Sequence, residues 1–379
     1  MVANIAVTMP FFLTATLAIR ISDDLGFKAA GLGVLLAVFG LGGAISAPPM
    51  GRLVERLGAE TSLRTSIAVS ATALVTIGLF VDRWWHMAGL LFVLGMVSSF
   101  NQAAGNLWLV RVLNGSRLGL AFGFKHAGAP ASALLAGLAV PTLAVLAGWR
   151  GTFITFGVLA GFAVLLLPRT SIRGTGRTAP NRTGDVPIGP LVVVSAGMAI
   201  GMGTAAAFTG FAVIAMVEQV GISEAAAGTL FAFGGMTGIM ARIGFGRLAD
   251  RVQGGLFPAA ASLVALGGLG LVTLATGSKL AFLFGVPFVF VTGWGWTGIF
   301  NQAVTMANAN SPAVATGITQ AGASTGVIIG PAVFGLVYSR SFETAWLLAS
   351  AASFMGAAII LHGGRLIKRR HLETGGAPT

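Results

Sequence analysis

The sequence predicts an all-α membrane protein with twelve transmembrane helices in two pseudo-symmetric six-helix bundles. Three observations lead to this prediction. Of the 379 residues, 55% are hydrophobic and only 9% are charged, whereas soluble domains carry about 25% charged residues. The apolar residues fall into segments of about 20, the length that spans the hydrocarbon core as a helix. Finally, short motifs of the first half recur in the second half at a nearly constant offset.

Twelve apolar segments have the required length, and each is expected to form one spanning helix. They cover residues 2–19, 29–50, 64–81, 85–110, 118–146, 150–167, 189–216, 224–245, 256–276, 279–308, 313–337 and 343–362. The first begins almost at Met1, so either this helix is short or the natural start lies upstream. An even number of helices places both termini on one side of the membrane.

The longest polar gap lies between the sixth and seventh segments and is rich in Arg, Thr, Gly and Pro. Such a composition is typical of a flexible linker. We therefore expect a first bundle over 1–167, a linker over 168–188, and a second bundle over 189–379 that ends in a short basic tail.

The two halves repeat one another. Residues 23–27 match 218–222, residues 51–56 match 246–251, residues 100–103 match 300–303, and residues 123–128 match 317–322. The offsets are 195, 195, 200 and 194 residues, which indicates duplication of a six-helix unit. Parallel repeats of this kind place a binding site at their interface, near the middle of the bilayer.

The charges predict the orientation. Sixteen Lys and Arg lie on one set of alternate loops and the C-terminal tail, and six lie on the opposite loops. This bias predicts cytoplasmic termini and a multi-pass protein of the cell membrane. The net charge of +12 follows from the bias, so we expect no nucleic-acid partner. All eleven carboxylates lie at loops or helix ends.

Several classes of function are not expected. There are no cysteines for thiol catalysis or metal binding, and no GxxxxGK[ST] motif for ATP hydrolysis. No Ser–His–Asp or metal-ligand cluster is visible. We therefore expect neither an enzyme nor a cofactor or metal. The expected partners are the lipid bilayer and a small-molecule substrate, and the expected state is a monomer.

Two neighbouring basic residues stand inside the fifth apolar segment, Lys125 and His126. A charged side chain at membrane depth costs at least about 2.5–3.5 kcal/mol, so it usually faces a protein interior or a wet cavity. We predict that Lys125 binds an anionic substrate; the alternative is that it snorkels to the membrane surface. His126 is a candidate coupling residue because imidazole exchanges protons near neutral pH, or else a packing residue.

Other candidate lining residues are polar or aromatic groups placed within predicted spans. They are Arg242, Asn101, Asn301, Gln302, Trp294 and Gln320. Polar side chains at this depth face protein because lipid offers them no partners. The alternatives are helix–helix hydrogen bonding for the amides, packing for Trp294, and surface anchoring for Arg242.

The repeated basic motif has a known counterpart. The major facilitator superfamily carries a loop that reads roughly G-x-L-a-D-R-x-G-R-R after helix 2, with a weaker copy after helix 8. Gly51, Glu55 and Arg56 match the first copy, with Glu in place of Asp. In the second copy Gly246, Asp250 and Arg251 match. The chain thus resembles this superfamily over its whole length.

This resemblance implies the major facilitator fold, alternating access between two rocking bundles, and a gating role for the six motif residues. The alternative is that their charges only set topology. A second, local resemblance joins residues 241–246 to the A-R-x-x-x-G of monocarboxylate transporters, which implies that Arg242 binds a carboxylate. The acidic partner of that family is replaced by Gly238.

Together these features predict a secondary active transporter of a small solute, most of all an organic anion such as a carboxylate. One alternative is efflux of apolar or weakly polar drugs. An alternative from another class is a membrane-embedded ligand sensor that does not translocate its ligand.

Overall fold

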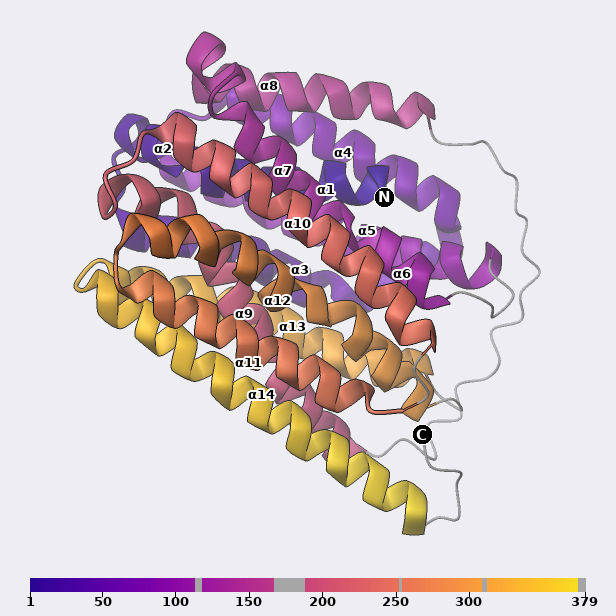
Figure 1. Ribbon diagram of the computed structural model, residues 1–379. Coiled ribbons are helices and arrows are strands. Elements are labelled where there is room, and N and C mark those ends of the chain that lie inside the picture. The colour runs from indigo at the N-terminus through magenta and orange to yellow at the C-terminus, as the bar shows by residue number, and fades with distance from the viewer. Residues whose placement is uncertain (113–117, 167–187, 252–253, 309–311, 374–379) are drawn as a thin grey trace.

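A computed structural model describes residues 1–112, 118–166, 188–251, 254–308 and 312–373 (Figure 1). Within these ranges all regular structure is helical. The helices are α1 (Val2–Thr16), α2 (Ala18–Leu25), α3 (Ala29–Leu57), α4 (Ala59–Phe80), α5 (Trp84–Val112), α6 (Leu118–His126), α7 (Gly128–Ala139), α8 (Leu143–Leu166), α9 (Ile188–Glu218), α10 (Glu224–Arg251), α11 (Leu256–Ala275), α12 (Lys279–Ala307), α13 (Pro312–Tyr338) and α14 (Phe342–Glu373). Nearly all of the predicted linker 168–188 lies outside the described residues.

The fourteen helices follow the twelve predicted spans, two of which are divided. Ten described helices are each long and apolar enough to cross a membrane. The number rises to eleven if α1 and α2, which are bent by 71° relative to each other, are counted together as one span. The predicted span 118–146 is divided between α6 and α7 at Ala127. In the second half the corresponding α9 and α13 are single helices, so the repeat is only approximate.

The basic motifs are helical, which corrects their expected position in loops. Residues 51–56 form the last turns of α3, and residues 246–251 form those of α10. Charged residues can continue a helix once it has left the hydrocarbon core, and nothing in the first motif interrupts the backbone before Gly58. Gly58 adopts φ 82°, a conformation that suits glycine and ends α3.

The helices form two groups, α1–α8 and α9–α14, and the start of α1 lies on the same side of the molecule as the end of α14 (Figure 1). We call that side the terminal face. The groups meet mainly where α3 packs on α13 and where α6 and α7 pack on α10.

Glycines allow several helices to touch backbone to backbone. A Cβ on Gly95 of α5 would lie 1.9 Å from the Phe39 oxygen of α3, and one on Gly42 would lie 2.0 Å from the Phe92 oxygen. Across the two groups, a Cβ on Gly33 would lie 2.4 Å from the Pro331 oxygen. Such contacts drive helix association in lipid, where the hydrophobic effect between helices is absent.

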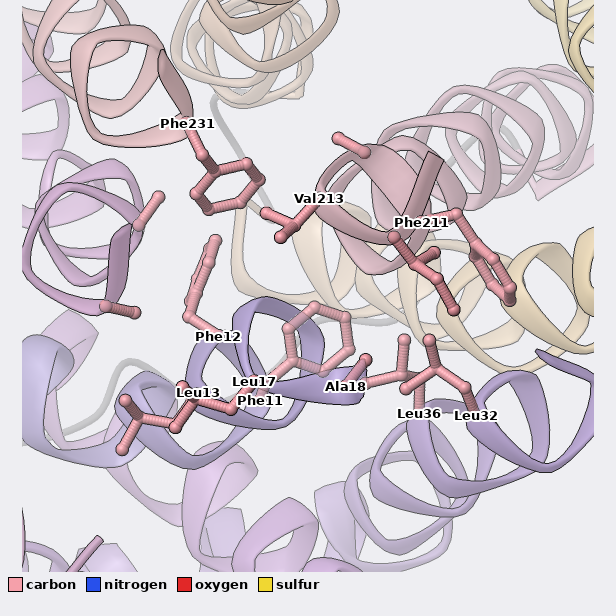
Figure 2. Packing of buried hydrophobic residues seen from close by; sticks show 14 of the residues in the cluster. Phe11, Phe12, Leu13, Leu17, Ala18, Leu32, Leu36, Phe211, Val213 and Phe231 are labelled. Carbon is pink, nitrogen blue, oxygen red and sulfur yellow. The ribbon is translucent and has the colours of Figure 1, made fainter. Parts of the chain in front are cut away.

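An apolar layer closes the interface on the side opposite the terminal face. In Figure 2, Phe12 of α1 points toward Phe231 of α10, and Leu32 and Leu36 of α3 point toward Phe211 of α9. Each of these five side chains is at most 3% exposed. Beyond this layer, Arg20 Nε of α2 donates to Glu224 Oε2 of α10 at 2.7 Å.

We expect Gly95→Ala to lower the thermal stability of the detergent-solubilised protein by several degrees. The added methyl would overpack the contact between α3 and α5, a change that typically costs about 1–3 kcal/mol. Gly89→Ala is the matched control in the same helix, because its Cβ would meet nothing within 4 Å. Equal melting temperatures for the two variants would contradict the close contact.

Candidate functional site

A cavity of about 150 Å³ lies between the two groups, on the terminal-face side of the apolar layer. Both groups contribute to its wall. Its polar lining consists of Asn4, Thr8, Gln102, His126, Arg242, Trp294, Thr297, Asn301 and Gln320. Its apolar lining includes Phe11, Phe12, Phe39, Met198, Met202 and Val327. Among the described residues that line it, none is Asp or Glu.

The cavity holds one deeply buried cation, Arg242 of α10, which is 5% exposed. Its Nε donates to the Trp294 carbonyl at 3.1 Å, and its guanidinium carbon lies 5.3 Å from the centroid of the Trp294 ring. Its Nη1 donates to the carbonyl of His126, the last residue of α6. Arg242 therefore links the two groups and also contributes to the cavity wall.

No carboxylate neutralises this cation in the described part of the chain, where the four ion pairs involve other residues. Its contacts are carbonyl oxygens and a ring face. The guanidinium of Arg242 lies at the carboxyl end of α6, where the helix carries partial negative charge, and this position favours a cation. The bonds to the Trp294 and His126 carbonyls use two of the five guanidinium N–H groups.

Trp294 of α12 joins the cavity to the apolar layer. Its Nε1 donates to Thr209 Oγ1 at 2.9 Å, and its ring lies 6.5 Å from that of Phe12. The ring is therefore fixed in orientation between the polar cavity and the closed side.

Lys125 lines a second cavity of about 340 Å³, which adjoins the first. Its Nζ donates to Asn106 Oδ1 at 2.5 Å and to the Gln102 carbonyl at 3.3 Å. At 7% exposed, the side chain is buried among α1, α5 and α6 rather than extended to the membrane surface. Asn101 lines this same second cavity and is 2% exposed.

Asn4 of α1 lines both cavities. Its Nδ2 donates to the Lys125 carbonyl at 3.2 Å, and its Oδ1 is 3.5 Å from the amide nitrogens of Asn101 and Gln102. Two amide oxygens here, Asn101 Oδ1 and Gln102 Oε1, are buried and have no hydrogen-bond partner among the described residues. Buried acceptors normally have a donor, so these two atoms are available to a ligand or water.

The family model described as Major Facilitator Superfamily matches residues 1–331. The chain belongs to the major facilitator superfamily. It is thus a multi-pass membrane transporter of the major facilitator type, in agreement with its apolar helices. A comparison with curated proteins found no match.

In this major facilitator, five of the predicted site residues line the first cavity, which lies between the two groups and is called the central cavity below. They are His126, Arg242, Trp294, Asn301 and Gln320. Lys125 and Asn101 occupy the second cavity, so a single anion held jointly by Lys125 and Arg242 is not what the geometry shows. Gln302 points elsewhere: its Nε2 donates to the Ala249 carbonyl of α10 at 3.2 Å, as expected of helix–helix hydrogen bonding.

The predicted gating residues receive less support from contacts. Glu55 and Arg56 are exposed at the end of α3, and among the described residues Glu55 forms no ion pair. Gly246 packs closely on Gly123 of α6, since a Cβ on Gly123 would lie 3.7 Å from the Gly246 Cα. The side chains of Asp250 and Arg251 lie outside the described residues.

Sequence reasoning missed the apolar wall and one polar partner. Phe11, Phe12 and Phe39 look like any other apolar residues of a spanning segment, so no local signal separates them from core. Asn106, which binds Lys125, did carry a signal: it is an amide one helical turn and a half after Asn101.

The cavity predicts a difference between two neighbouring positions of α12. Because the chain lacks cysteine, Asn301→Cys and Gln302→Cys would each carry the single thiol. We expect a small water-soluble thiol reagent to modify Cys at 301 about tenfold faster than Cys at 302, since access governs thiol modification. Equal rates in membrane vesicles would contradict the assignment of Asn301 to the cavity.

Proposed function

We propose that this major facilitator transports a small organic anion, best a carboxylate, by alternating access of two bundles over 1–167 and 189–379. The observation that carries the proposal is Arg242, a buried cation in the wall of the interface cavity, where the described lining residues include no carboxylate. An uncompensated buried charge is costly. A mobile anion supplies the missing charge, and its departure restores the empty state.

The chemistry of Arg242 suits a carboxylate. A guanidinium binds carboxylates through paired N–H donors, and such charge-assisted bonds are roughly twice as strong as neutral ones. Asn301, Gln320 and Thr297 line the same cavity and can bind further oxygens of the substrate. The local resemblance of residues 241–246 to monocarboxylate transporters supports the same assignment.

The size of the cavity favours a small substrate over a drug. About 150 Å³ is below the roughly 300–1,000 Å³ of pockets that enclose drug-sized ligands. Drug efflux remains the alternative because Phe11, Phe39 and Met202 supply apolar wall. A ligand sensor is the alternative from another class, and it would bind carboxylate without flux.

Lys125 and His126 are assigned supporting roles. Lys125 in the second cavity attracts the anion on the terminal-face side. Asn4 lines both cavities and lies between Lys125 and the cavity of Arg242. His126, which lines the central cavity, is the candidate coupling residue.

The excess of Lys and Arg supports a cytoplasmic terminal face in the cell membrane. In that orientation the apolar layer closes the outer side, and the motifs of α3 and α10 gate the inner side. We further propose that the transporter acts as a monomer.

Arg242→Ala is expected to abolish carboxylate flux in proteoliposomes. It should also raise the anion concentration that gives half-maximal thermal stabilisation by about ten- to a hundredfold. A hydrogen bond to a charged group contributes about 1.5–3 kcal/mol, which corresponds to this range. The control is Arg369→Ala, which removes an arginine at an exposed position of α14 outside both motifs. Carboxylate binding without flux in the unaltered protein would favour the sensor. Flux of neutral drugs alone, insensitive to Arg242→Ala, would favour efflux.

Lys125→Gln is expected to raise the KM for the anion several-fold at low ionic strength while the maximal rate changes little. A fixed positive charge raises the local anion concentration, and salt screens this effect. The dependence of KM on salt should therefore flatten in the variant. Lys368→Gln, at an exposed position of α14, is the control. An unchanged KM with unchanged salt dependence would remove Lys125 from the substrate path.

A further inference from the structure

The break between α6 and α7 has a chemical origin in Pro130. In an α-helix the carbonyl of residue i accepts from the N–H of residue i+4, and proline has no N–H. Pro130 is the i+4 residue of His126, so the His126 carbonyl has no i+4 donor. Inside a membrane such a carbonyl must find another donor within the protein.

That donor is Arg242 of the other helix group. Its Nη1 donates to the His126 oxygen, while its Nε donates to the Trp294 carbonyl at 3.1 Å. The guanidinium thus bridges one carbonyl from each group. The neighbouring Lys125 carbonyl is satisfied within its own group, by Asn4 Nδ2 at 3.2 Å.

The bridge lies beside close backbone contacts of α6 and α7 with α10. A Cβ on Gly123 would lie 2.8 Å from the Arg242 carbonyl oxygen, and a Cβ on Gly235 would lie 2.7 Å from the Pro130 oxygen. The backbone of α10 thus closely approaches α6 at Arg242 and α7 at Pro130. Separation of the two groups along this line would break the bond between Arg242 and His126.

The internal repeat supplies a comparison within the same chain. At the repeat offset of 194, His126 corresponds to Gln320 and Pro130 to Ser324. Serine has an N–H, and α13 runs from Pro312 to Tyr338 as one helix through both positions. The half with proline is broken and the half with serine is continuous.

We propose that Pro130 is a positioning residue for Arg242. By withholding an N–H from the His126 carbonyl, Pro130 leaves that oxygen to the guanidinium. This arrangement orients Arg242 toward the cavity and stabilises the conformation in which the two groups are joined at α6, α7 and α10. The assignment of Arg242 to anion binding rests on the proposed function, whereas the bridge between the groups does not depend on it.

The test measures distances between the two groups without substrate. Spin labels are attached to cysteine pairs introduced at exposed residues: Leu57 with Leu248 toward the terminal face, and Leu146 with Leu280 on the opposite face. The chain has no native cysteine to interfere. Pro130→Ala supplies an N–H that competes with Arg242 for the His126 oxygen. Each pair should report one distance for the joined groups and a second distance for the separated groups. We expect the ratio of the second population to the first to rise about tenfold in both pairs.

Two further variants separate the bridge from general effects of proline. In an Arg242→Ala background, Pro130→Ala should cause no additional change, because the bond with which it competes is already absent. Pro287→Ala is the matched control: it also lies inside a spanning helix, but the carbonyl four residues before it belongs to the exposed Leu283 of the same group. Pro130→Ser, which copies the repeat, replaces the alanine variant if that variant expresses poorly.

The proposal is overturned if Pro130→Ala leaves both distance distributions unchanged, if its effect persists without Arg242, or if Pro287→Ala has an equal effect. A failure of the proposed function would appear elsewhere, as absence of anion flux and of anion-dependent stabilisation in the unaltered protein. In transport assays Pro130→Ala should raise the KM for the anion while Arg369→Ala, at an exposed position of α14 outside the motifs, should not.

Discussion

Within a bilayer, every backbone carbonyl needs a donor supplied by the protein itself. Most of this chain meets that requirement by forming long helices, as in α3, α5 and α12. The requirement has its largest consequence where the helix fails, between α6 and α7. There the carbonyls of Lys125 and His126 accept from side chains of other helices, Asn4 and Arg242. The defect in one helix therefore fixes contacts both within a bundle and between the bundles.

The same interaction connects packing to transport chemistry. Arg242 is buried, satisfies a carbonyl of each group, and contributes to a cavity that contains no described carboxylate. Under the proposed function, a residue placed in this way would respond both to the separation of the groups and to the presence of an anion. Because a ligand shifts a conformational equilibrium only through its different affinity for the two states, such a residue is suited to couple substrate binding to bundle movement.

The contacts between the two groups differ in kind on the two sides of the cavity. On the side opposite the terminal face, the contact consists of large apolar side chains from both groups, such as Phe12 and Phe231, with the ion pair of Arg20 and Glu224 beyond it. On the terminal-face side, glycines such as Gly123 and Gly246 bring α6 and α10 together. Apolar side chains exclude water without requiring polar partners, whereas the glycine contact depends on close backbone approach.

The sequence by itself determined the class of fold, the number and order of the spans, and the duplication, because span length, loop charge and repeated motifs are local properties of the chain. It also marked the buried cations, since a charge in an apolar segment is conspicuous. It did not determine that Lys125 and Arg242 lie in different cavities, or that Gln302 bonds to α10 while Asn301 faces the cavity. Those outcomes depend on which face of each helix meets a neighbour. Only the tertiary structure decided them, because the rotation of each helix is set by packing between segments far apart in sequence.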